Sequence, residues 1–325
     1  RMTPLLSPDD PAVTIIRDLL AASTRVLVTT HRHPDGDAIG AILGIAGALR
    51  ERSTTVTAHA PDVPPAFLRF LRGFDTITTA PGPVTQFDLV IALDHSELSR
   101  TGLAPELLEG IVPVVAIDHH ATFDRRATVS IMLPEVSSTC ELLTHLFPAL
   151  GLPMDAATAT CLLTGIVTDT GSFQHANTSA RTLTIASSLL AAGADFRAII
   201  AGVFGSRPLP ALRIMGRALE RLEANPRTGA ALSFVTQDDL RECGATLDDL
   251  TGVVNLLNTI PEARFSLLLT EYEHGKLKGS LRSEPEKAVD VSAIARRFGG
   301  GGHTLASGFE VAGQLVRDEQ GWRIA

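Results

Sequence analysis

The chain has 325 residues, a formal net charge of −8 and an apolar content of 45%. This length is typical of about two domains. The acidic balance argues against a protein that coats long nucleic acid, because such proteins are usually basic. No apolar run reaches the roughly 18 residues of a membrane span. We therefore expect no contact with long duplex DNA or with a membrane, while a small anionic substrate held by local charges remains compatible with the composition.

The cysteine pattern indicates the redox environment. Cys140, Cys161 and Cys243 are odd in number and widely spaced, which is typical of reduced thiols. They form no CxxC pair of the kind that binds structural zinc. The first ten residues, RMTPLLSPDD, lack the charged-then-apolar pattern of a signal peptide. These observations predict a cytoplasmic protein.

The first part of the chain alternates between strand-like and helix-like segments. Short apolar segments predict strands at residues 25–30, 55–59, 88–93 and 112–117. Helix-like sequence separates them at residues 37–51, 64–72 and 103–109. Such alternation predicts a parallel α/β sheet. In sheets of this kind, ligands bind outside the carboxyl ends of the strands.

Helical sequence dominates the middle of the chain, from about residue 137 to residue 222. It includes an Ala/Leu-rich helix at residues 180–192, which Gly193 closes as a C-cap. Residues 204–210, FGSRPLP, contain the glycine and prolines of a loop. We place a linker around this loop.

The last part of the chain has a different pattern. Three segments alternate like antiparallel strands, at residues 229–235, 264–272 and 276–282, with His274 and Gly275 as a turn. Helix-like pieces lie at residues 246–259 and 290–297. This pattern predicts a smaller α+β domain. The predicted organisation is a first domain at residues 1–190, a linker at 191–212 and a second domain at 213–325.

Potential metal ligands follow three of the four early strands. They are His31, Asp35 and Asp37 after the first strand, Asp94 and His95 after the third, and Asp118, His119 and His120 after the fourth. The segment LLTGIVTDTGSF adds Asp169. Because the carboxyl ends of parallel strands share one edge, we expect these side chains to converge.

The residue types indicate which ions this cluster would bind. Carboxylates and imidazoles without thiolates suit hard to borderline divalent ions such as Mn²⁺ or Mg²⁺. So many ligands suggest two ions about 3.5–4 Å apart, bridged by a carboxylate. A single Asp after a strand is usually a turn residue or a helix N-cap, and Asp37 taken alone would fit that interpretation. Acids or imidazoles at the ends of four separate segments favour a metal site instead.

The same segments resemble the motifs of a known family. HRHPDGDAIG, ALDHSELSRTG, VAIDHHATFD and TGIVTDTGSF are similar, in order and spacing, to the motifs of the DHH phosphoesterases. FGGGGHTLASGF resembles the glycine-rich signature of the associated DHHA1 domain. The resemblance implies an α/β architecture, in which a parallel-sheet DHH domain is joined by a helical linker to a smaller α+β DHHA1 domain. The active site would lie in the cleft between them.

The resemblance also implies roles for individual residues. It assigns His31 and Asp35 to one ion, Asp37, His119 and Asp169 to a second, and Asp94 to both. Asp94, Asp118 and His120 would be catalytic, with Asp118 orienting a histidine and His120 facing the substrate phosphate or the leaving group. Mn²⁺ is the expected ion, with Mg²⁺ or Co²⁺ as alternatives. His33 and His95 depart from the family pattern, and each is either an alternative ligand or a residue that supports one.

The second domain is expected to bind the substrate. The run from Gly299 to Gly302 has no side chains, so its backbone N–H groups can approach an anion closely. The expected contacts are Gly300, Gly301, Gly302, His303, Arg282 and, from the first domain, Arg100. An arginine offers a planar fork to a phosphate or a base. Residues 264–303 carry seven Lys or Arg and five Asp or Glu, a local charge of +2 that suits a small nucleotide.

The predicted function is a Mn²⁺-dependent phosphodiesterase. The resemblance points to short, stand-alone enzymes that hydrolyse cyclic dinucleotides such as c-di-AMP, linear dinucleotides such as pApA, or nano-RNA. They would release 5′-mononucleotides by means of a water activated between two metal ions. One alternative is a pAp 3′-phosphatase, alone or combined with the first activity. Another is a nucleotide sensor with a dead metal site, which the presence of every expected ligand argues against. The resemblance also allows a homodimer.

Overall fold

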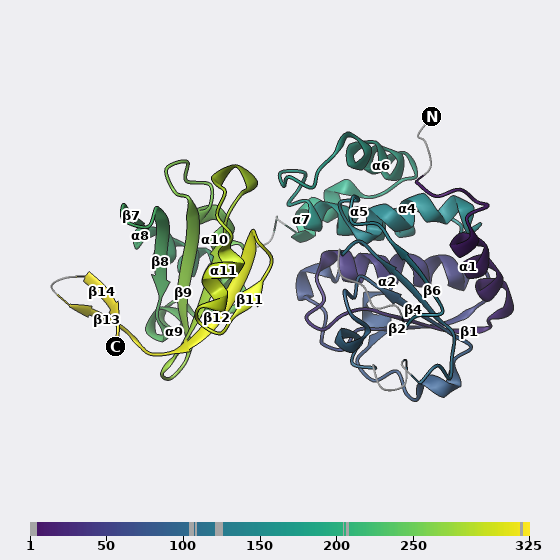
Figure 1. The fold of residues 1–325 in the computed structure, drawn as a ribbon, viewed down its shortest axis with the longest axis horizontal. Coiled ribbons are helices and arrows are strands. Elements are labelled where there is room, and N and C mark those ends of the chain that lie inside the picture. Colours follow the sequence, from purple (N-terminus) through teal and green to yellow (C-terminus); the bar gives the residue numbers. More distant parts are fainter. Residues whose placement is uncertain are drawn as a thin grey trace. The chain divides into compact units, whose positions relative to one another are not determined.

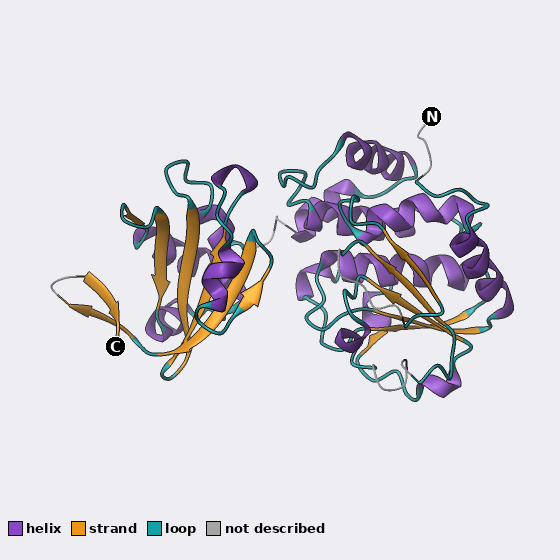
Figure 2. Ribbon diagram, in the orientation of Figure 1, coloured by secondary structure: helices purple, strands orange, loops and turns teal. Residues whose placement is uncertain are grey.

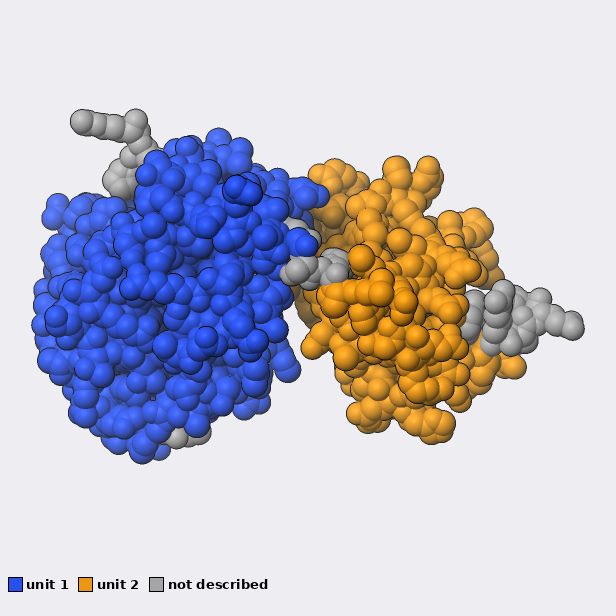
Figure 3. Space-filling model, turned by 180° about the vertical axis from the view of Figure 1, so that it is seen from behind, with its two compact units in different colours: residues 1–206 blue, residues 207–325 orange. Residues whose placement is uncertain are grey.

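The computed structural model describes residues 5–103, 107, 109–120, 126–203, 205, 208–318 and 321–325. The chain divides into two compact units, residues 1–206 and 207–325 (Figure 3). Most of the helix predicted at residues 103–109 lies outside the described residues, as do the last residues of the VAIDHHATFD motif. Parts of the loop predicted at residues 204–210 also lie outside them. The boundaries predicted for the linker, 191–212, stay a prediction.

Unit 1 contains a six-stranded parallel sheet in the order β3-β2-β1-β4-β5-β6 (Figure 1). Its strands are β1 (Arg25–Thr29), β2 (Thr55–His59), β3 (Ile77–Thr78), β4 (Leu89–Leu93), β5 (Val114–Asp118) and β6 (Val129–Met132). The predicted parallel sheet and its four early strands are confirmed. β3 and β6 were not predicted. The strand order reverses between β1 and β4, and ligands of such sheets bind at this switch point.

Helices accompany the sheet of unit 1 (Figure 2). They are α1 (Pro11–Ala22), α2 (Gly36–Glu51), α4 (Thr139–Ala149), α5 (Ala156–Asp169), α6 (Ala180–Ala191) and α7 (Phe196–Val203). The helices predicted at residues 37–51 and 180–192 are confirmed, and Gly193 has the left-handed φ of 96° expected after a helix end. Among the described residues, no single helix is long and apolar enough to span a membrane. Only α6 and α7, bent by 116°, reach that length and composition together.

The helix predicted at residues 64–72 is wrong. Only a short 3-10 turn, η1 (Ala66–Leu68), forms there. Hydrogen bonds from the N–H of Leu68 to Pro65, of Leu71 to Leu68 and of Phe74 to Leu71 repeat at three-residue spacing. This spacing buries Leu68, Leu71 and Phe74 on one side, and a 3-10 backbone provides it better than an α-helix does.

Unit 2 is built on a mixed sheet in the order β11-β12-β10-β9-β8-β7. These strands are β7 (Glu223–Asn225), β8 (Ala230–Val235), β9 (Phe265–Glu273), β10 (Lys276–Arg282), β11 (Gly301–Gly302) and β12 (Ala306–Ala312). Its helices are α8 (Leu209–Glu220), α9 (Gln237–Cys243), α10 (Val253–Leu257) and α11 (Val291–Arg296). A separate hairpin pairs β13 (Leu315–Asp318) with β14 (Gly321–Ile324). The predicted α+β character is confirmed.

Two predictions for unit 2 need correction. β8 pairs with β9 in parallel, although an antiparallel arrangement was predicted. Parallel neighbours need a crossover connection, and α9 and α10 lie in that connection. The helix predicted at residues 246–259 is divided into η5 (Asp248–Leu250) and α10, because Gly252 adopts a left-handed φ of 85° between them. The predicted hairpin of β9 and β10 is confirmed, with Gly275 in its turn.

Glycines bring α2 and α5 unusually close together. Gly36, Gly40 and Gly44 repeat at four-residue spacing, so they share one face of α2. A Cβ added to Gly40 would overlap the Cys161 carbonyl oxygen. A Cβ added to Gly44 would lie 2.9 Å from Leu162 Cδ2. The absence of side chains on this face therefore sets the distance between the two helices.

We expect Gly40→Ala to lower the free energy of unfolding by about 2 kcal/mol, because the added methyl group overlaps the α5 backbone. Gly47→Ala is the matched control on the same helix. There the nearest atom, Thr158 Oγ1, would lie 3.4 Å from the new Cβ. This control should leave stability unchanged or raise it by up to about 1 kcal/mol through helix propensity. Urea unfolding of both variants measures the difference, and equal values would show that the glycine face does not control the packing.

Candidate metal centre

The carboxyl edge of the unit 1 sheet gathers the acids and imidazoles singled out in the sequence. Three sets of residues have ligand atoms within 4.8 Å of one another. They are His31, Asp35 and Asp94; Asp37, His119 and Asp169; and Asp94, His119 and His120. The structure therefore brings together all six residues predicted to bind metal, and it adds His120 beside them.

Asp94 occupies the middle of this cluster. It directly follows β4 with a left-handed φ of 50°, and it is 2% exposed. Its carboxylate lies 3.5 Å from His31 Nε2 and 3.7 Å from His119 Nε2. The Thr139 hydroxyl donates a hydrogen bond to Asp94 Oδ1 at 3.1 Å. Asp94 thus faces two different sets of ligand atoms.

The start of α4 holds the carboxylate of Asp37. The backbone N–H of Thr139 donates to Asp37 Oδ2 at 2.7 Å, and that of Cys140 donates to Oδ1 at 3.0 Å. These N–H groups belong to the first turn of a helix, where they have no partner within the helix and where the helix dipole favours a negative charge. The pattern of Ser138 followed by Glu141 signals a helix start. It does not reveal which carboxylate that start will face, so Thr139 and Cys140 were missed.

Asp35 has two roles in the structure. It is the N-cap of α2, where its Oδ1 accepts the N–H groups of Asp37 and Ala38, each at 3.0 Å. The capping interpretation that the sequence allowed for Asp37 therefore applies to Asp35. Asp35 is also a member of the set with His31 and Asp94.

Asp118 fixes the loops that follow β4 and β5. It is fully buried, and it accepts hydrogen bonds from His120 Nδ1 at 2.7 Å and from the backbone N–H of His95 at 2.9 Å. The N–H groups of Ser96 and His120 also donate to it. Asp118 itself is outside the three ligand sets. It orients His120 instead.

The two unexpected histidines lie outside the three sets as well. His95 is fully buried, with its Nδ1 at 3.2 Å from an Asp118 oxygen. The His33 side chain is 93% exposed, and its backbone N–H donates to Asp62 at 2.7 Å. His95 therefore supports the cluster through Asp118, while His33 is exposed and contacts Asp62.

The structure places the predicted substrate-binding residues in both units. In unit 1, Arg100 Nη2 lies 3.2 Å from His31 Nδ1, so this arginine borders the ligand cluster. In unit 2, Arg282 Nε donates to Asn255 Oδ1 at 2.9 Å. This contact places the arginine on the α10 side of the sheet.

In the glycine run of unit 2, residues 299–302, some backbone N–H groups already form hydrogen bonds within the unit. The N–H of Gly300 donates to the Ala295 carbonyl at 3.0 Å, and that of His303 donates to Ala306 at 2.8 Å. Gly301 and Gly302 form β11 at the edge of the sheet. An edge strand presents unpaired backbone groups. Gly301 and Gly302 pair with Gly308 and Ser307 of β12 on one side, and no described strand lies on the other.

The electrostatics of the cluster favour a bound cation. Burial and the charge of Asp94 raise the pKa of Asp37 to about 7. Partial burial, together with the charges of Asp37 and Asp94, raises the pKa of Asp169 well above its ordinary value. Burial also opposes ionisation of Asp94, but its hydrogen bond with His31 and the charge of His119 lower its pKa. A divalent ion would stabilise all three ionised carboxylates.

The donor set fits hard to borderline divalent ions. It consists of carboxylate oxygens and imidazole nitrogens, which are ligands of Mg²⁺ and Mn²⁺. The nearby thiol of Cys140 donates to the Asp37 backbone carbonyl instead. Burial and the charge of Asp37 raise the pKa of this thiol, so it stays neutral and offers no thiolate. The residues present therefore fit an oxygen-rich site for divalent cations.

Comparisons with known proteins agree on one family. Residues 25–166 match the DHH family, N-terminal domain, and residues 230–319 match the DHHA1 domain. The bifunctional oligoribonuclease and PAP phosphatase NrnA of Thermus thermophilus is 34% identical over 91% of this chain and 86% of its own length. The cyclic-di-AMP phosphodiesterase PdeA of Listeria monocytogenes is 29% identical over 89% of this chain and 45% of its own length. The crystal structure of an exopolyphosphatase-related protein from Bacteroides fragilis has a TM-score of 0.90 and 27% identity, covering 96% of this chain and 94% of that chain.

We expect the metal-free protein to lose stability as the pH rises from about 6 to about 8. Asp37 has a pKa of about 7 in the folded state, above its ordinary 3.8. The folded state therefore binds more protons than the unfolded chain, and its stability falls as those protons leave. The contribution of Asp37 over this range is about 1 kcal/mol.

Thermal unfolding in EDTA, compared between the wild type and Asp37→Asn, measures this contribution. The variant should show the shallower decrease, because its amide does not titrate. Added Mn²⁺ should raise the melting temperature of the wild type more at the higher pH, where protons compete less for the ligands. Parallel pH profiles for the two proteins would contradict the expected role of Asp37.

Proposed function

The chain belongs to the DHH family and carries a DHHA1 domain, so it is a metal-dependent phosphoesterase, and on this premise we propose that it is a Mn²⁺-dependent phosphodiesterase of very short nucleotides. The proposed substrates are cyclic dinucleotides such as c-di-AMP, linear dinucleotides such as pApA, and nano-RNA. The proposed products are 5′-mononucleotides. The names of the relatives NrnA and PdeA support this substrate class.

The proposal rests on Asp94, because this residue belongs to two of the three ligand sets. One set joins Asp94 to His31 and Asp35, and another joins it to His119 and His120. His119 also belongs to the set of Asp37 and Asp169. A carboxylate shared in this way is what two neighbouring ions need. We therefore assign His31 and Asp35 to one ion, Asp37, His119 and Asp169 to the other, and Asp94 to both.

The residues of the site can be given distinct roles in phosphodiester hydrolysis. Divalent ions bound here would supply Lewis acidity toward the phosphate and a water of lowered pKa. Asp118 holds His120 through Nδ1. It thereby leaves Nε2 as the nitrogen that can exchange a proton with the leaving oxygen. Arg100, beside His31, would help to neutralise the phosphate.

We assign phosphate binding in unit 2 to the glycine run and its neighbours. Gly301 and Gly302 lie in the edge strand β11, and His303 follows them directly. Gly300 supports this edge through its own hydrogen bond to Ala295. Arg282 would add a charged fork for a phosphate or a base. The cleft in which both domains would meet the substrate stays a prediction.

A pAp 3′-phosphatase is the second candidate function. It is favoured by the relative from Thermus thermophilus, whose name includes both activities. The same ligand sets could serve both reactions, because each breaks a phosphate ester bond. A nucleotide sensor with a dead metal site is disfavoured, because all the expected ligand residues are present and close together.

The first test is a product assay with Mn²⁺ on pApA, c-di-AMP, a short RNA and pAp offered side by side. We expect 5′-mononucleotides from at least one dinucleotide. Asp94→Ala should reduce the rate by more than about 100-fold, because loss of a residue that only orients a metal ligand already costs about 10- to 100-fold. Asp75→Ala, which removes an exposed acid outside the three ligand sets, is the matched control. Turnover of pAp alone would select the phosphatase, and no turnover with any divalent ion would reject an enzyme.

A second test separates Asp118 from the metal ligands. We expect Asp118→Asn to lower kcat by about 10- to 100-fold, because the amide has one acceptor oxygen, so either His120 or the loop after β4 faces an NH2 group instead. The increase in melting temperature caused by Mn²⁺ should persist, because Asp118 is not in a ligand set. Loss of that increase together with activity would make Asp118 part of the metal site instead.

A further inference from the structure

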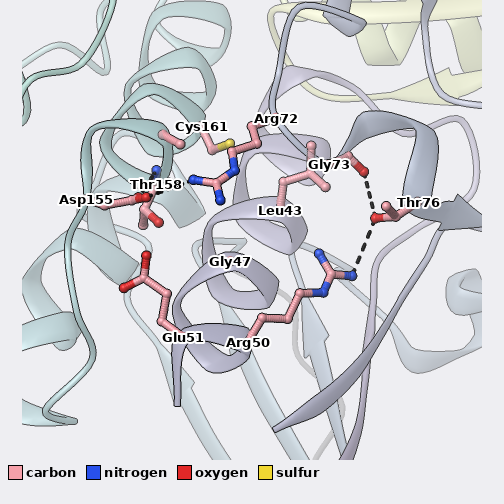
Figure 4. Close-up of a pocket in the computed structure, with 11 residues that line it drawn as sticks. Leu43, Gly47, Arg50, Glu51, Arg72, Gly73, Thr76, Asp155, Thr158 and Cys161 are labelled. Carbon is pink, nitrogen blue, oxygen red and sulfur yellow. Dashed lines mark hydrogen bonds and ion pairs between the residues drawn. The ribbon is translucent and has the colours of Figure 1, made fainter. Parts of the chain in front are cut away.

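Unit 1 contains a pocket whose lining includes none of the metal ligands (Figure 4). Its volume is about 460 Å³, within the range of small-molecule sites. It is bordered by the end of α2, the start of α5 and the segment around Gly73. Asp37 begins α2 and Arg50 lies near its end. Because a helix rises 1.5 Å per residue, Arg50 lies about 20 Å along α2 from Asp37, and Leu43, at the near side of the pocket, lies about 9 Å from it.

The lining of the pocket includes apolar side chains and two glycines. Leu43 and Cys161, both 2% exposed, contribute apolar lining. Gly47 and Gly73 border the space without side chains (Figure 4). A Cβ on Gly73 would lie 3.4 Å from Leu43 Cδ2 and 3.7 Å from Arg50 Nη1. Gly73 also has a left-handed φ of 90°, which favours glycine there.

Two guanidinium groups border this space, on different sides of it (Figure 4). Arg50 is held by the Val56 carbonyl at 3.2 Å and by the Thr76 hydroxyl at 3.4 Å, both of which are neutral acceptors. Its charge is therefore positioned without being neutralised by these partners. Arg72 lies on the other side, where it contacts Asp155 at 3.1 Å and its charge is paired. The fork of Arg50 matches the oxygens of a phosphate.

Carboxylates occupy another side of the pocket. Glu51 and Asp155 lie across from Arg50 (Figure 4). Asp155 already accepts the N–H of Thr158 at 2.7 Å as the cap of α5. A simple polyanion would be repelled on this side. The ligand therefore needs a phosphate at one end and hydrogen-bond donors, such as an amino group or hydroxyls, at the other.

We propose that this pocket binds a nucleoside 5′-monophosphate, with its phosphate on Arg50 and its base or ribose donors on Glu51. The need for a phosphate and for donors follows from the pocket alone. The choice of a nucleotide among such ligands rests on the proposed function, whose products are 5′-mononucleotides. The bound nucleotide contacts both α2 and α5, the helices that carry Asp37 and Asp169 at their opposite ends.

The test measures AMP binding to the full chain in EDTA by titration calorimetry. Without a divalent ion, phosphate groups lose the metal-dependent contacts of the active site. We expect Arg50→Gln to weaken AMP binding at this pocket by at least about tenfold, through loss of a charge-assisted hydrogen bond. Arg52→Gln is the matched control, because it removes the same charge at the same helix end outside the pocket. It should bind like the wild type.

A second variant tests whether weaker binding by Arg50→Gln results from a folding defect. Gly47→Leu fills the pocket without removing a charge, and a leucine is favourable within a helix. It should also weaken AMP binding by at least about tenfold. Equal AMP affinity in Arg50→Gln, Gly47→Leu and Arg52→Gln would overturn the proposal.

Adenosine and inorganic phosphate identify the ligand class. Both should bind more weakly than AMP, because each reaches only one side of the pocket. Equal affinity for phosphate and AMP would reduce the pocket to a general anion site and overturn the assignment.

The result of this binding test is also independent of catalysis. A protein that cleaves dinucleotides but keeps AMP affinity in both variants loses only this inference. One that cleaves no substrate but loses AMP binding in both variants loses only the proposed function.

Discussion

The repulsion between buried carboxylates at one sheet edge is the constraint on which the rest of unit 1 depends. Asp37 and Asp94 are almost inaccessible to water, and Asp169 lies near His119 beside them. Like charges this close, in a region of low dielectric, raise each other's pKa or require a cation. The protein offsets part of the cost with its own groups. The first turn of α4 donates to Asp37, and His31 faces Asp94. The remaining excess of negative charge is what a divalent ion neutralises.

That constraint explains why α2 and α5 pack through glycine. Asp37 lies in the first turn of α2, and Asp169 is the last residue of α5. The two carboxylates can share a ligand set only if the helix backbones approach closely at this end. Gly165 of α5 has no side chain where a Cβ would lie 2.6 Å from Asp37 Oδ1. Small residues in the contact thus provide the space that the ligands occupy. The same small residues therefore determine both the packing of the two helices and the geometry of the site.

The sequence predicted the positions of the ligands better than it predicted what supports them. Acids that directly follow apolar strands can be located from the local pattern, and a parallel sheet then brings them to one edge. The contacts of Thr139 and Cys140 with Asp37 join residues about a hundred positions apart, so no local pattern contains them. β3 and β6 were missed for a related reason. They are short, and pairing with neighbours stabilises them more than their own composition does.

The glycines of the run in unit 2 differ in how strongly packing requires them. A Cβ on Gly300 would lie 2.6 Å from Phe309 Cα, and one on Gly302 would lie 2.7 Å from the Ala306 carbonyl oxygen. These two glycines are required by the fold, whether or not a ligand is present. A Cβ on Gly301 would have none of the described atoms within 4 Å, so packing does not require glycine there. Close approach of the proposed phosphate would give a physical reason for glycine at this edge position. If the run binds phosphate as proposed, Gly301 is a position where a side chain would hinder the ligand without a clash in the fold.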